Sequence, residues 1–207
     1  FKNTIDEGTP IVMFDRVADS IECDKIITND FDGAVNAVQH LSKSGHKKIA
    51  FVSTLSHLNI GRLRHQGYIK GLEKEGIPLN QDYIINIKED DYKEYENVLT
   101  PIFEKLDLDG VITTDESSAI AAMKVAIRKG HKVPDNFSVI AFSNGILARH
   151  SSPKMTTVSQ HGEQMGAAAA ERLINKLKKK KEDQQNKTIV IKTDIVERKS
   201  TKPVKIL

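Results

Sequence analysis

Several features that would place this 207-residue chain in a membrane or outside the cell are missing from its sequence. It has no run of about 18 apolar residues, which a membrane-spanning helix requires. Its first residues lack the basic start, apolar stretch and small-residue cleavage site of a secretory signal peptide. Cys23 is the single cysteine, which excludes an internal disulfide and fits a reducing compartment. We therefore expect a cytoplasmic protein with no membrane association.

The sequence is also poor in the residue patterns that catalytic and metal sites use. Its seven histidines include no i, i+4 pair on one predicted helix and have no neighbouring cysteine, so no zinc site is predicted. Cys23 has acidic neighbours on both sides, which is an unfavourable setting for a nucleophile. The chain has neither a Gly-x-Ser-x-Gly elbow nor a glycine loop for phosphate. We expect a protein that is not an enzyme and needs no metal or cofactor.

The charge balance is too even to predict nucleic-acid binding. The formal net charge is +3, and the one dense basic cluster is Lys176 with Lys178 and residues 179–181. This cluster falls at the end of a predicted helix, where lysines favour the negative pole of the helix dipole, and two acidic residues follow it. We interpret it as a solvated helix end and not as a phosphate contact.

Short apolar runs alternate with amphipathic segments, a pattern typical of parallel strands covered by helices. Residues 49–52 are continuously apolar, as expected of a strand that is buried on both faces. The predicted strands are 11–14, 25–28, 48–53, 83–87, 110–113, 137–142, 156–159 and 188–192. The predicted helices are 30–44, 60–75, 92–106, 116–129 and 161–180. Pro101 predicts a kink in helix 92–106, or a helix start nearer Thr100.

Five segments resemble one protein family in both their amino-acid sequences and their order along the chain. They are residues 33–53 (GAVNAVQHLSKSGHKKIAFVS), 61–77 (GRLRHQGYIKGLEKEGI), 113–130 (TTDESSAIAAMKVAIRKG), 133–160 (VPDNFSVIAFSNGILARHSSPKMTTVSQ) and 193–201 (TDIVERKST). Together they make the chain similar to the sugar-sensing region of the lac repressor-like (LacI/GalR) bacterial transcription regulators. The resemblance covers nearly the whole chain, and we expect the helix-turn-helix DNA-binding domain of such regulators to be absent from it.

The resemblance implies an α/β fold of the periplasmic-binding-protein type I. In that fold, two parallel-sheet, Rossmann-like lobes are joined by three crossovers and hold a ligand between them. The matching motifs place the crossovers near Asn29, near Gln160 and within residues 181–187. Residues 30–159 and 188–207 would then form the C-terminal lobe. Residues 1–29 and 160–187 would form a remnant of the N-terminal lobe, which is only partly present.

Ligands of open α/β sheets bind at the carboxyl ends of the strands, and polar residues follow several predicted strands there. Arg64, on the first turns of helix 60–75, offers a fork of donors to sugar hydroxyls. In the family, the arginine three residues before the Gly-aromatic pair binds sugar hydroxyls, and Arg64 matches it, with Arg62 as the neighbouring alternative. The predicted effector-binding residues are Asp15, Arg64, Thr114, Asp115, Ser143 and Asn144.

Two of these residues have structural alternatives. Arg64 could pair locally, and Asp115 is expected to act mainly as the N-cap of helix 116–129. If Arg64 binds an effector, we expect it to contribute little to stability, because it lies near a helix start and outside the apolar stripe.

The sequence departs from the family pattern at the expected site. Ser143 stands where many relatives have an acid, and Gly162 stands where an aromatic residue is common. Another usual aromatic position aligns near Glu89 or Asp90. These departures leave a family-typical hexose in doubt. A phosphorylated, acidic or different ligand remains open, as does a protein signal in place of a small molecule.

The resemblance implies the effector-binding and dimerisation region of a transcriptional repressor. Such a region senses a sugar or sugar-like effector, forms a homodimer, and controls operator binding only through the missing N-terminal domain. The alternative is a periplasmic sugar-binding protein of a transporter, which shares the fold. The wording of VPDNFSVIAFSN, TTVSQ and VERKST favours the regulator.

Overall fold

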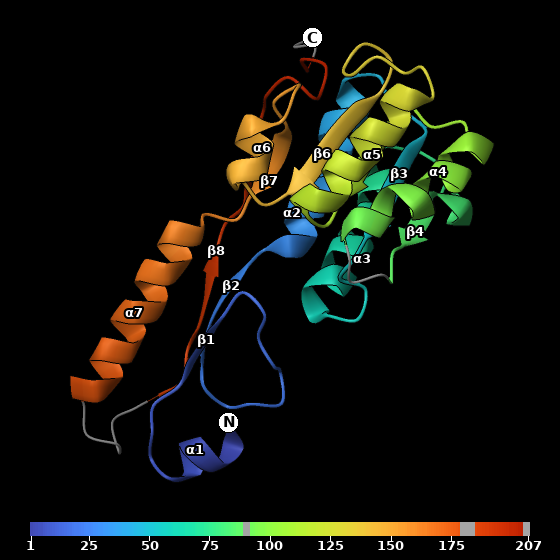
Figure 1. Ribbon diagram of the computed structural model, residues 1–207. Helices are drawn as coiled ribbons and strands as arrows, with labels where there is room; N and C mark the ends of the chain where they lie inside the picture. The colour runs from blue at the N-terminus through green and yellow to red at the C-terminus, as the bar shows by residue number, and fades with distance from the viewer. Residues whose placement is uncertain (89–91, 179–184, 205–207) are drawn as a thin grey trace. The chain divides into compact units, whose positions relative to one another are not determined.

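The computed structural model describes residues 1–88, 92–178 and 185–204. The chain forms two compact units (Figure 1). Unit 1 consists of Phe1–Asn29 and Gln160–Thr193, and unit 2 consists of Asp30–Ser159 and Asp194–Leu207.

Unit 2 is built on a six-stranded sheet with the strand order β4-β3-β5-β6-β7-β9. All neighbouring strands are parallel except β7 and β9, which are antiparallel. The strands are β3 (Ile49–Ser53), β4 (Ile84–Asn86), β5 (Gly110–Thr113), β6 (Ser138–Phe142), β7 (Thr156–Ser159) and β9 (Asp194–Val196). The expected α/β class is confirmed, and the four strands predicted near 48–53, 83–87, 110–113 and 137–142 share one parallel sheet.

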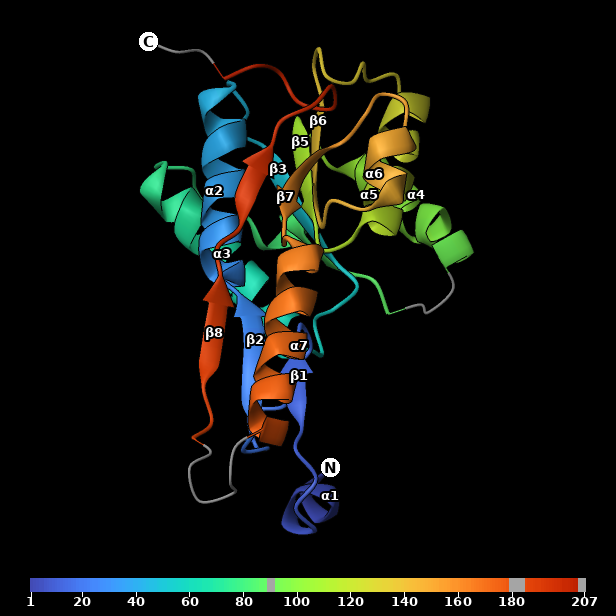
Figure 2. The same cartoon turned by 90° about the vertical axis from the view of Figure 1, so that its left-hand side faces the viewer.

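Helices cover both faces of this sheet (Figure 2). One face carries α2 (Asp30–Lys43) and α3 (Asn59–Lys74), and the other carries α4 (Tyr95–Lys105) and α5 (Glu116–Arg128). Each face has its own hydrophobic core. Leu41, Phe51, Tyr68 and Leu72 belong to the first core, and Leu99, Phe103, Val125 and Phe137 belong to the second. Because both faces are covered, every residue of β3, β5, β6 and β7 is buried.

Some short elements were not predicted. These are the helices α1 (Lys2–Asp6) and α6 (Ile146–His150), the 3-10 turns Gln81–Tyr83 and Tyr92–Glu94, and strand β9. The expectation of a helix start near Thr100 is wrong, because α4 begins at Tyr95 and continues through Pro101. Pro101 has no N–H to donate to the Asn97 carbonyl one turn earlier, and beside it the Thr100 hydroxyl donates to the Glu96 carbonyl at 2.6 Å.

Residues 197–204, after β9, lie against unit 2 through buried polar contacts. Ser200 Oγ donates to the Val139 carbonyl at 2.6 Å, and the Val139 N–H donates to the Ser200 carbonyl at 2.9 Å. Thr201 Oγ1 lies 3.1 Å from His40 Nε2 and 2.8 Å from Thr156 Oγ1. Burial lowers the pKa of His40, which favours the neutral ring. These bonds fix the chain end beside β6 and β7.

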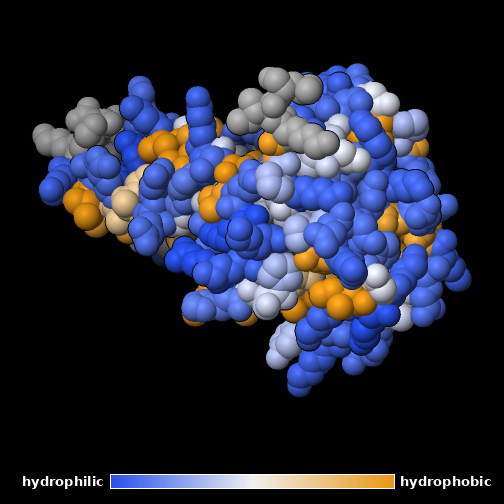
Figure 3. All heavy atoms as spheres, turned by 90° about the horizontal axis from the view of Figure 1, so that it is seen from above, coloured by the Kyte–Doolittle hydropathy of each residue, from blue (hydrophilic) through white to orange (hydrophobic). Residues whose placement is uncertain are grey.

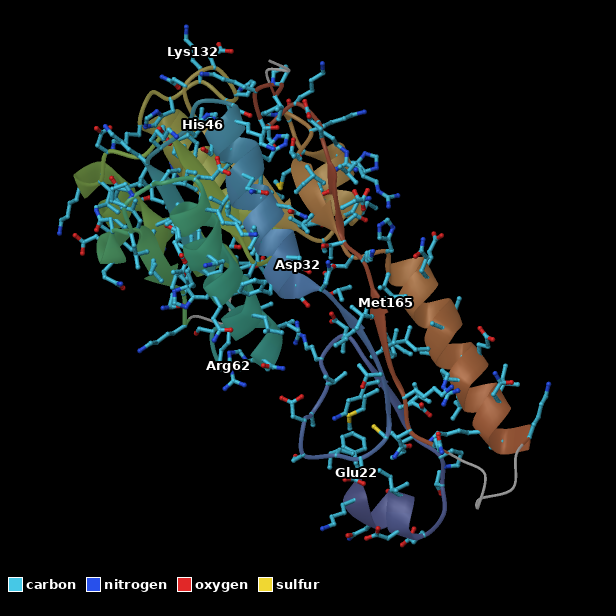
Figure 4. All side chains as sticks on the ribbon, turned by 180° about the vertical axis from the view of Figure 1, so that it is seen from behind. Glu22, Asp32, His46, Arg62, Lys132 and Met165 are labelled. Carbon is cyan, nitrogen blue, oxygen red and sulfur yellow. The ribbon has the colours of Figure 1, made fainter. Side chains whose placement is uncertain are left out.

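Unit 1 contains a three-stranded parallel sheet with the order β1-β2-β8 and one long helix, α7 (Gly162–Lys178). Its strands are β1 (Val12–Phe14), β2 (Asp24–Thr28) and β8 (Thr188–Ile191). Met165 and Ala169 of α7 pack on Ile26 of β2. In Figure 4, Met165 marks α7.

The predicted boundary of the C-terminal lobe at residue 188 is wrong. β8 pairs with β2, starting with Thr188 opposite Lys25, so residues 188–193 belong to unit 1. A strand's apolar pattern shows that it joins a sheet, but not which sheet. The crossover expected at 181–187 falls partly on residues 179–184, which are outside the described residues.

The basic end of α7 also differs from the prediction of a fully solvated helix end. Lys176 is buried, and its Nζ lies 3.1 Å from Asp24 Oδ2. Asp24 also accepts hydrogen bonds from Arg172 Nη2 and the Lys187 N–H, both at 2.7 Å. Burial alone raises the pKa of Asp24, but these donors outweigh it and hold the pKa below its usual value. Lysines 179–181 lie outside the described residues.

No helix among the described residues is long and apolar enough to cross a membrane. The face drawn in Figure 3 is mostly hydrophilic, with hydrophobic residues in separate patches.

Two glycines of α3 allow close packing against α2. A Cβ on Gly67 would lie 2.2 Å from the Phe31 carbonyl oxygen, and a Cβ on Gly71 would lie 2.7 Å from Val38 Cβ. We expect Gly67→Ala and Gly71→Ala to lower the free energy of unfolding by about 1–3 kcal/mol, because the helices must move apart.

Urea denaturation measures this effect. Gly166→Ala in α7 is the matched control, because a Cβ there meets nothing within 4 Å. Alanine should raise helix stability at that position by about 0.5–1 kcal/mol. Unchanged stability in Gly67→Ala would contradict the close approach.

Candidate functional site

Polar residues gather where β3, β5 and β6 end in unit 2. Because these strands are parallel neighbours, their carboxyl ends lie along the same edge of the sheet, where open α/β sheets bind ligands. Thr54 follows β3, the pair Thr114–Asp115 follows β5, and the pair Ser143–Asn144 follows β6. We call this edge the strand-end site.

The ends of β3 and β5 are joined by side-chain hydrogen bonds. The Thr54 hydroxyl donates to Asp115 Oδ2 at 2.7 Å, and the Thr54 N–H donates to Thr114 Oγ1 at 3.1 Å. Asp115 Oδ1 accepts the Ser118 N–H at 2.9 Å, and Oδ2 also accepts the Ser118 hydroxyl at 2.7 Å. The predicted N-cap role of Asp115 is confirmed. Both of its carboxylate oxygens are therefore occupied by donors of the protein.

Arg64 is buried in this region rather than exposed at its rim. Its residue exposure is 2%, and its Nε and Nη2 atoms both lie 2.7 Å from Asp30 Oδ1. Nη1 donates to the Thr114 carbonyl at 2.8 Å. The guanidinium carbon lies 4.2 Å from the centre of the Phe142 ring, within range of a cation–π interaction. All three guanidinium nitrogens therefore have partners within the protein.

Asp30 is the first residue of α2, where a negative charge is favoured by the helix dipole. The Asp30–Arg64 pair thus joins the start of α2 to α3 and to the end of β5. A contact between Arg64 and an effector remains a prediction. The expectation that Arg64 contributes little to stability disagrees with its burial, because removing one partner strands the other charge.

Arg62 provides a clear contrast with Arg64. It is exposed on the first turn of α3, and its Nη2 lies 3.3 Å from Asn59 Oδ1 within the same turn. Figure 4 shows the Arg62 side chain at the end of α3. The two arginines lie only two positions apart, and the sequence did not show which of them is buried. The packing of α3 against its neighbours decides this.

The segment after β6 holds the next two predicted residues. Ser143 is half-buried, has φ of 70°, and donates its N–H to the Val158 carbonyl at 3.1 Å. Asn144 Oδ1 accepts a hydrogen bond from Arg198 Nη2. Arg198 is not among the predicted site residues, although it lies in the VERKST motif that carries part of the family resemblance. Burial lowers the pKa of Arg198, and the nearby Arg149 adds to this effect.

Asp15 is the one predicted residue that belongs to unit 1. It follows β1, has φ of 60°, and donates its N–H to the Ile26 carbonyl at 3.0 Å. Its Oδ1 lies 3.5 Å from Gln160 Nε2. Among the described residues, no group of three or more His, Cys, Asp and Glu side chains could hold a metal ion.

We expect Arg64→Ala to lower the free energy of unfolding by about 3–5 kcal/mol, because Asp30 would be left buried without its partner. Chemical denaturation measures the change. Arg62→Ala is the matched control on the same helix and should change stability by less than about 0.5 kcal/mol. Equal effects of the two substitutions would contradict a structural role for the Asp30–Arg64 pair.

Comparison with known proteins identifies the fold and its relatives. Residues 38–201 match the family model described as periplasmic binding protein-like domain. The HTH-type transcriptional repressor PurR of Yersinia pestis bv. Antiqua (strain Antiqua) is 34% identical over 180 residues, which cover 86% of this chain and 51% of the repressor. The chain therefore spans about half the length of this curated relative.

Solved structures show the same fold. A transcription regulator from Lactobacillus plantarum matches 97% of this chain and 75% of its own, with a TM-score of 0.86 and 24% identity. A LacI family transcriptional regulator from Enterococcus faecium, with bound ribose, matches 99% of this chain and 75% of its own, with a TM-score of 0.85 and 22% identity. The chain belongs to the family of periplasmic binding protein-like domains, in the form of a LacI/GalR-type effector-binding region.

Proposed function

We propose that this chain senses a small-molecule effector for a bacterial LacI-type transcriptional regulator, and that the effector is a sugar or a sugar derivative. The observation that carries the proposal is the strand-end site, where polar side chains follow three neighbouring parallel strands. The similarity to a transcriptional repressor supports a sensor over an enzyme. It also favours the regulator over the periplasmic transport protein. The ribose bound to the Enterococcus faecium regulator supports a sugar-sized effector.

Only some side chains of the strand-end site are available to hydrogen-bond an effector. Asp115 and Arg64 already use their charged groups on protein partners, so they offer less to a ligand than isolated side chains would. Ser143 is half-buried, and its hydroxyl makes no hydrogen bond to another described residue. This hydroxyl can donate and accept without adding charge. We therefore place a neutral hydrogen-bonding contact at the end of β6, which allows both neutral and anionic sugars.

Regulation would follow from a difference in affinity. An effector that binds one conformation of the region better than another shifts the population between them. The related repressor is described as HTH-type. In the intact protein, we propose that this shift would change how strongly a helix-turn-helix domain binds the operator. We place this regulation in the cytoplasm, where operator DNA is found.

Titration calorimetry with ribose, glucose, cellobiose, ribose 5-phosphate and glucose 6-phosphate tests the effector class. We expect Ser143→Asp to weaken binding of the sugar phosphates at least tenfold relative to the neutral sugars, because a carboxylate repels like charge. Ser143→Ala is the matched control, since it removes the hydroxyl without adding charge. No binding of any of these compounds at millimolar concentration would refute the proposed effector class.

We also propose a homodimer with a two-fold, isologous interface to which the face after Ser53 and residues 145–153 contribute. The support is α6, a five-residue helix on which Ile146 and Leu147 are 72% and 43% exposed. These adjacent side chains offer apolar surface that a partner subunit could bury.

Sedimentation velocity of the intact protein at micromolar concentration measures the assembly. We expect a dimer for the wild type and a shift towards monomer for Ile146→Glu, because a charge buried in an apolar interface is unfavourable. Leu79→Glu is the control, because Leu79 is 40% exposed and lies outside α6. A wild-type protein that is only monomeric would refute the dimer.

A further inference from the structure

Residues Ser143–Gly145, which we call the β6 loop, begin with an unfavourable backbone conformation. Ser143 has φ of 70°, in the left-handed region that residues other than glycine seldom adopt. Such a conformation is unfavourable and persists only where surrounding contacts fix it, commonly at functional sites. The contacts around the β6 loop therefore indicate what the conformation serves.

Each residue of the β6 loop is held from a different element of unit 2. The Ser143 N–H donates to the Val158 carbonyl of β7 at 3.1 Å. Asn144 Oδ1 accepts from Arg198, and the Asn144 carbonyl accepts from Arg149 Nη2 at 2.9 Å. The Gly145 N–H donates to Glu116 Oε1 at the start of α5. The backbone is thus fixed at three consecutive positions.

The carboxylate of Glu116 lies close to position 145. A Cβ on Gly145 would lie 2.8 Å from Glu116 Oε2 and 2.9 Å from Oε1. Gly145 itself has φ of −85°, so its backbone conformation does not require glycine. Glu116, a residue that is 9% exposed, places its carboxylate beside the loop, and a side chain at position 145 would have to push the end of this flexible side chain aside.

Arg198 fixes the middle of the loop to the start of β7. Its Nη1 donates to the Met155 carbonyl at 2.7 Å and to Thr157 Oγ1 at 3.2 Å, while Nη2 donates to Asn144 Oδ1. Asn144 Oδ1 is therefore occupied within the protein. Among the side-chain groups of the loop, the Ser143 hydroxyl and the Asn144 Nδ2 amide have no partner among the described residues, and the hydroxyl is the one that can both donate and accept.

We propose that Arg198 and Glu116 are positioning residues that hold the β6 loop so that Ser143 Oγ contacts the effector. In this assignment, Asn144 anchors the loop through its Oδ1 and its backbone carbonyl. The inference rests on the proposed function, because it requires an effector at the strand-end site. It adds to that function two residues, from α5 and from the segment after β9, which act on the effector only through Ser143.

Amide hydrogen exchange of the full chain tests the held loop without any effector. Arg198→Gln should speed exchange at Ser143 and Gly145 at least tenfold, while Val111 and Val139 in the central strands keep their protection.

Glu116→Ala should speed exchange at Gly145. Glu116→Gln should not, because its amide oxygen still accepts the Gly145 N–H. Arg128→Gln is the control for loss of an arginine, since Arg128 is exposed on α5 and pairs with Glu96. Unchanged exchange in both Arg198→Gln and Glu116→Ala would overturn the positioning roles.

A double-mutant cycle then separates positioning from a general structural effect. The probe is whichever of ribose, glucose, cellobiose, ribose 5-phosphate and glucose 6-phosphate the wild type binds most tightly. Ser143→Ala and Arg198→Gln should each weaken its binding about tenfold, and Arg198→Lys should restore part of the loss. The double variant should also be weakened about tenfold, and not a hundredfold, because Arg198 acts through Ser143.

The outcomes are distinct. Additive losses in the double variant would overturn the inference and leave the proposed function standing, since the probe would still bind. Unaltered binding in Ser143→Ala would likewise overturn the assignment of Ser143 as the contact. Failure of the wild type to bind any of the five compounds would refute the proposed effector class and, with it, the effector contact, while the exchange experiment would still decide whether the loop is held.

Discussion

The buried pair of Arg64 and Asp30 is the interaction on which the organisation of unit 2 depends most. Two charges with exposures of 2% each are removed from water, which is favourable only where geometry and further hydrogen bonds compensate. Here the Thr114 carbonyl and the face of Phe142 complete the surroundings of the guanidinium. The pair therefore fixes the start of α2, the second turn of α3 and the ends of β5 and β6 relative to one another. Those strand ends carry the candidate site.

The same principle recurs in unit 1, where one buried carboxylate meets two cationic side chains. Asp24 is fully buried and is surrounded by Arg172, Lys176 and the Lys187 N–H. These contacts join α7 and the segment before β8 to β2. In each unit, the carboxylate is on the first residue of an element, Asp30 of α2 and Asp24 of β2, and it stabilises one arrangement of the neighbouring elements. An apolar core alone tolerates several arrangements, whereas an unpaired buried charge does not.

The β6 loop shows how such contacts bear on function. Its first residue adopts a left-handed conformation, and charged side chains from two distant parts of the chain hold the two residues that follow. Fixed in this way, the Ser143 hydroxyl needs little reorganisation to meet a ligand, and preorganised groups bind with a smaller entropic cost. Ser143 gives the strand-end site a neutral contact. The charged side chains of Arg198 and Glu116 bind Asn144 and Gly145 of the loop.

The sequence by itself determined the α/β class, most strands and long helices, and the capping role of Asp115, because local periodicity and end signals carry that information. It did not predict α6, since five residues span little more than one helical turn, nor β9, whose apolar part is only Ile195 and Val196. Only the tertiary structure decided that β8 joins β2, that Arg64 is buried while Arg62 is exposed, and that Arg198 meets Asn144 across 54 residues of chain. Each of these depends on contacts between distant segments, which the packing of the whole unit selects and no local pattern encodes.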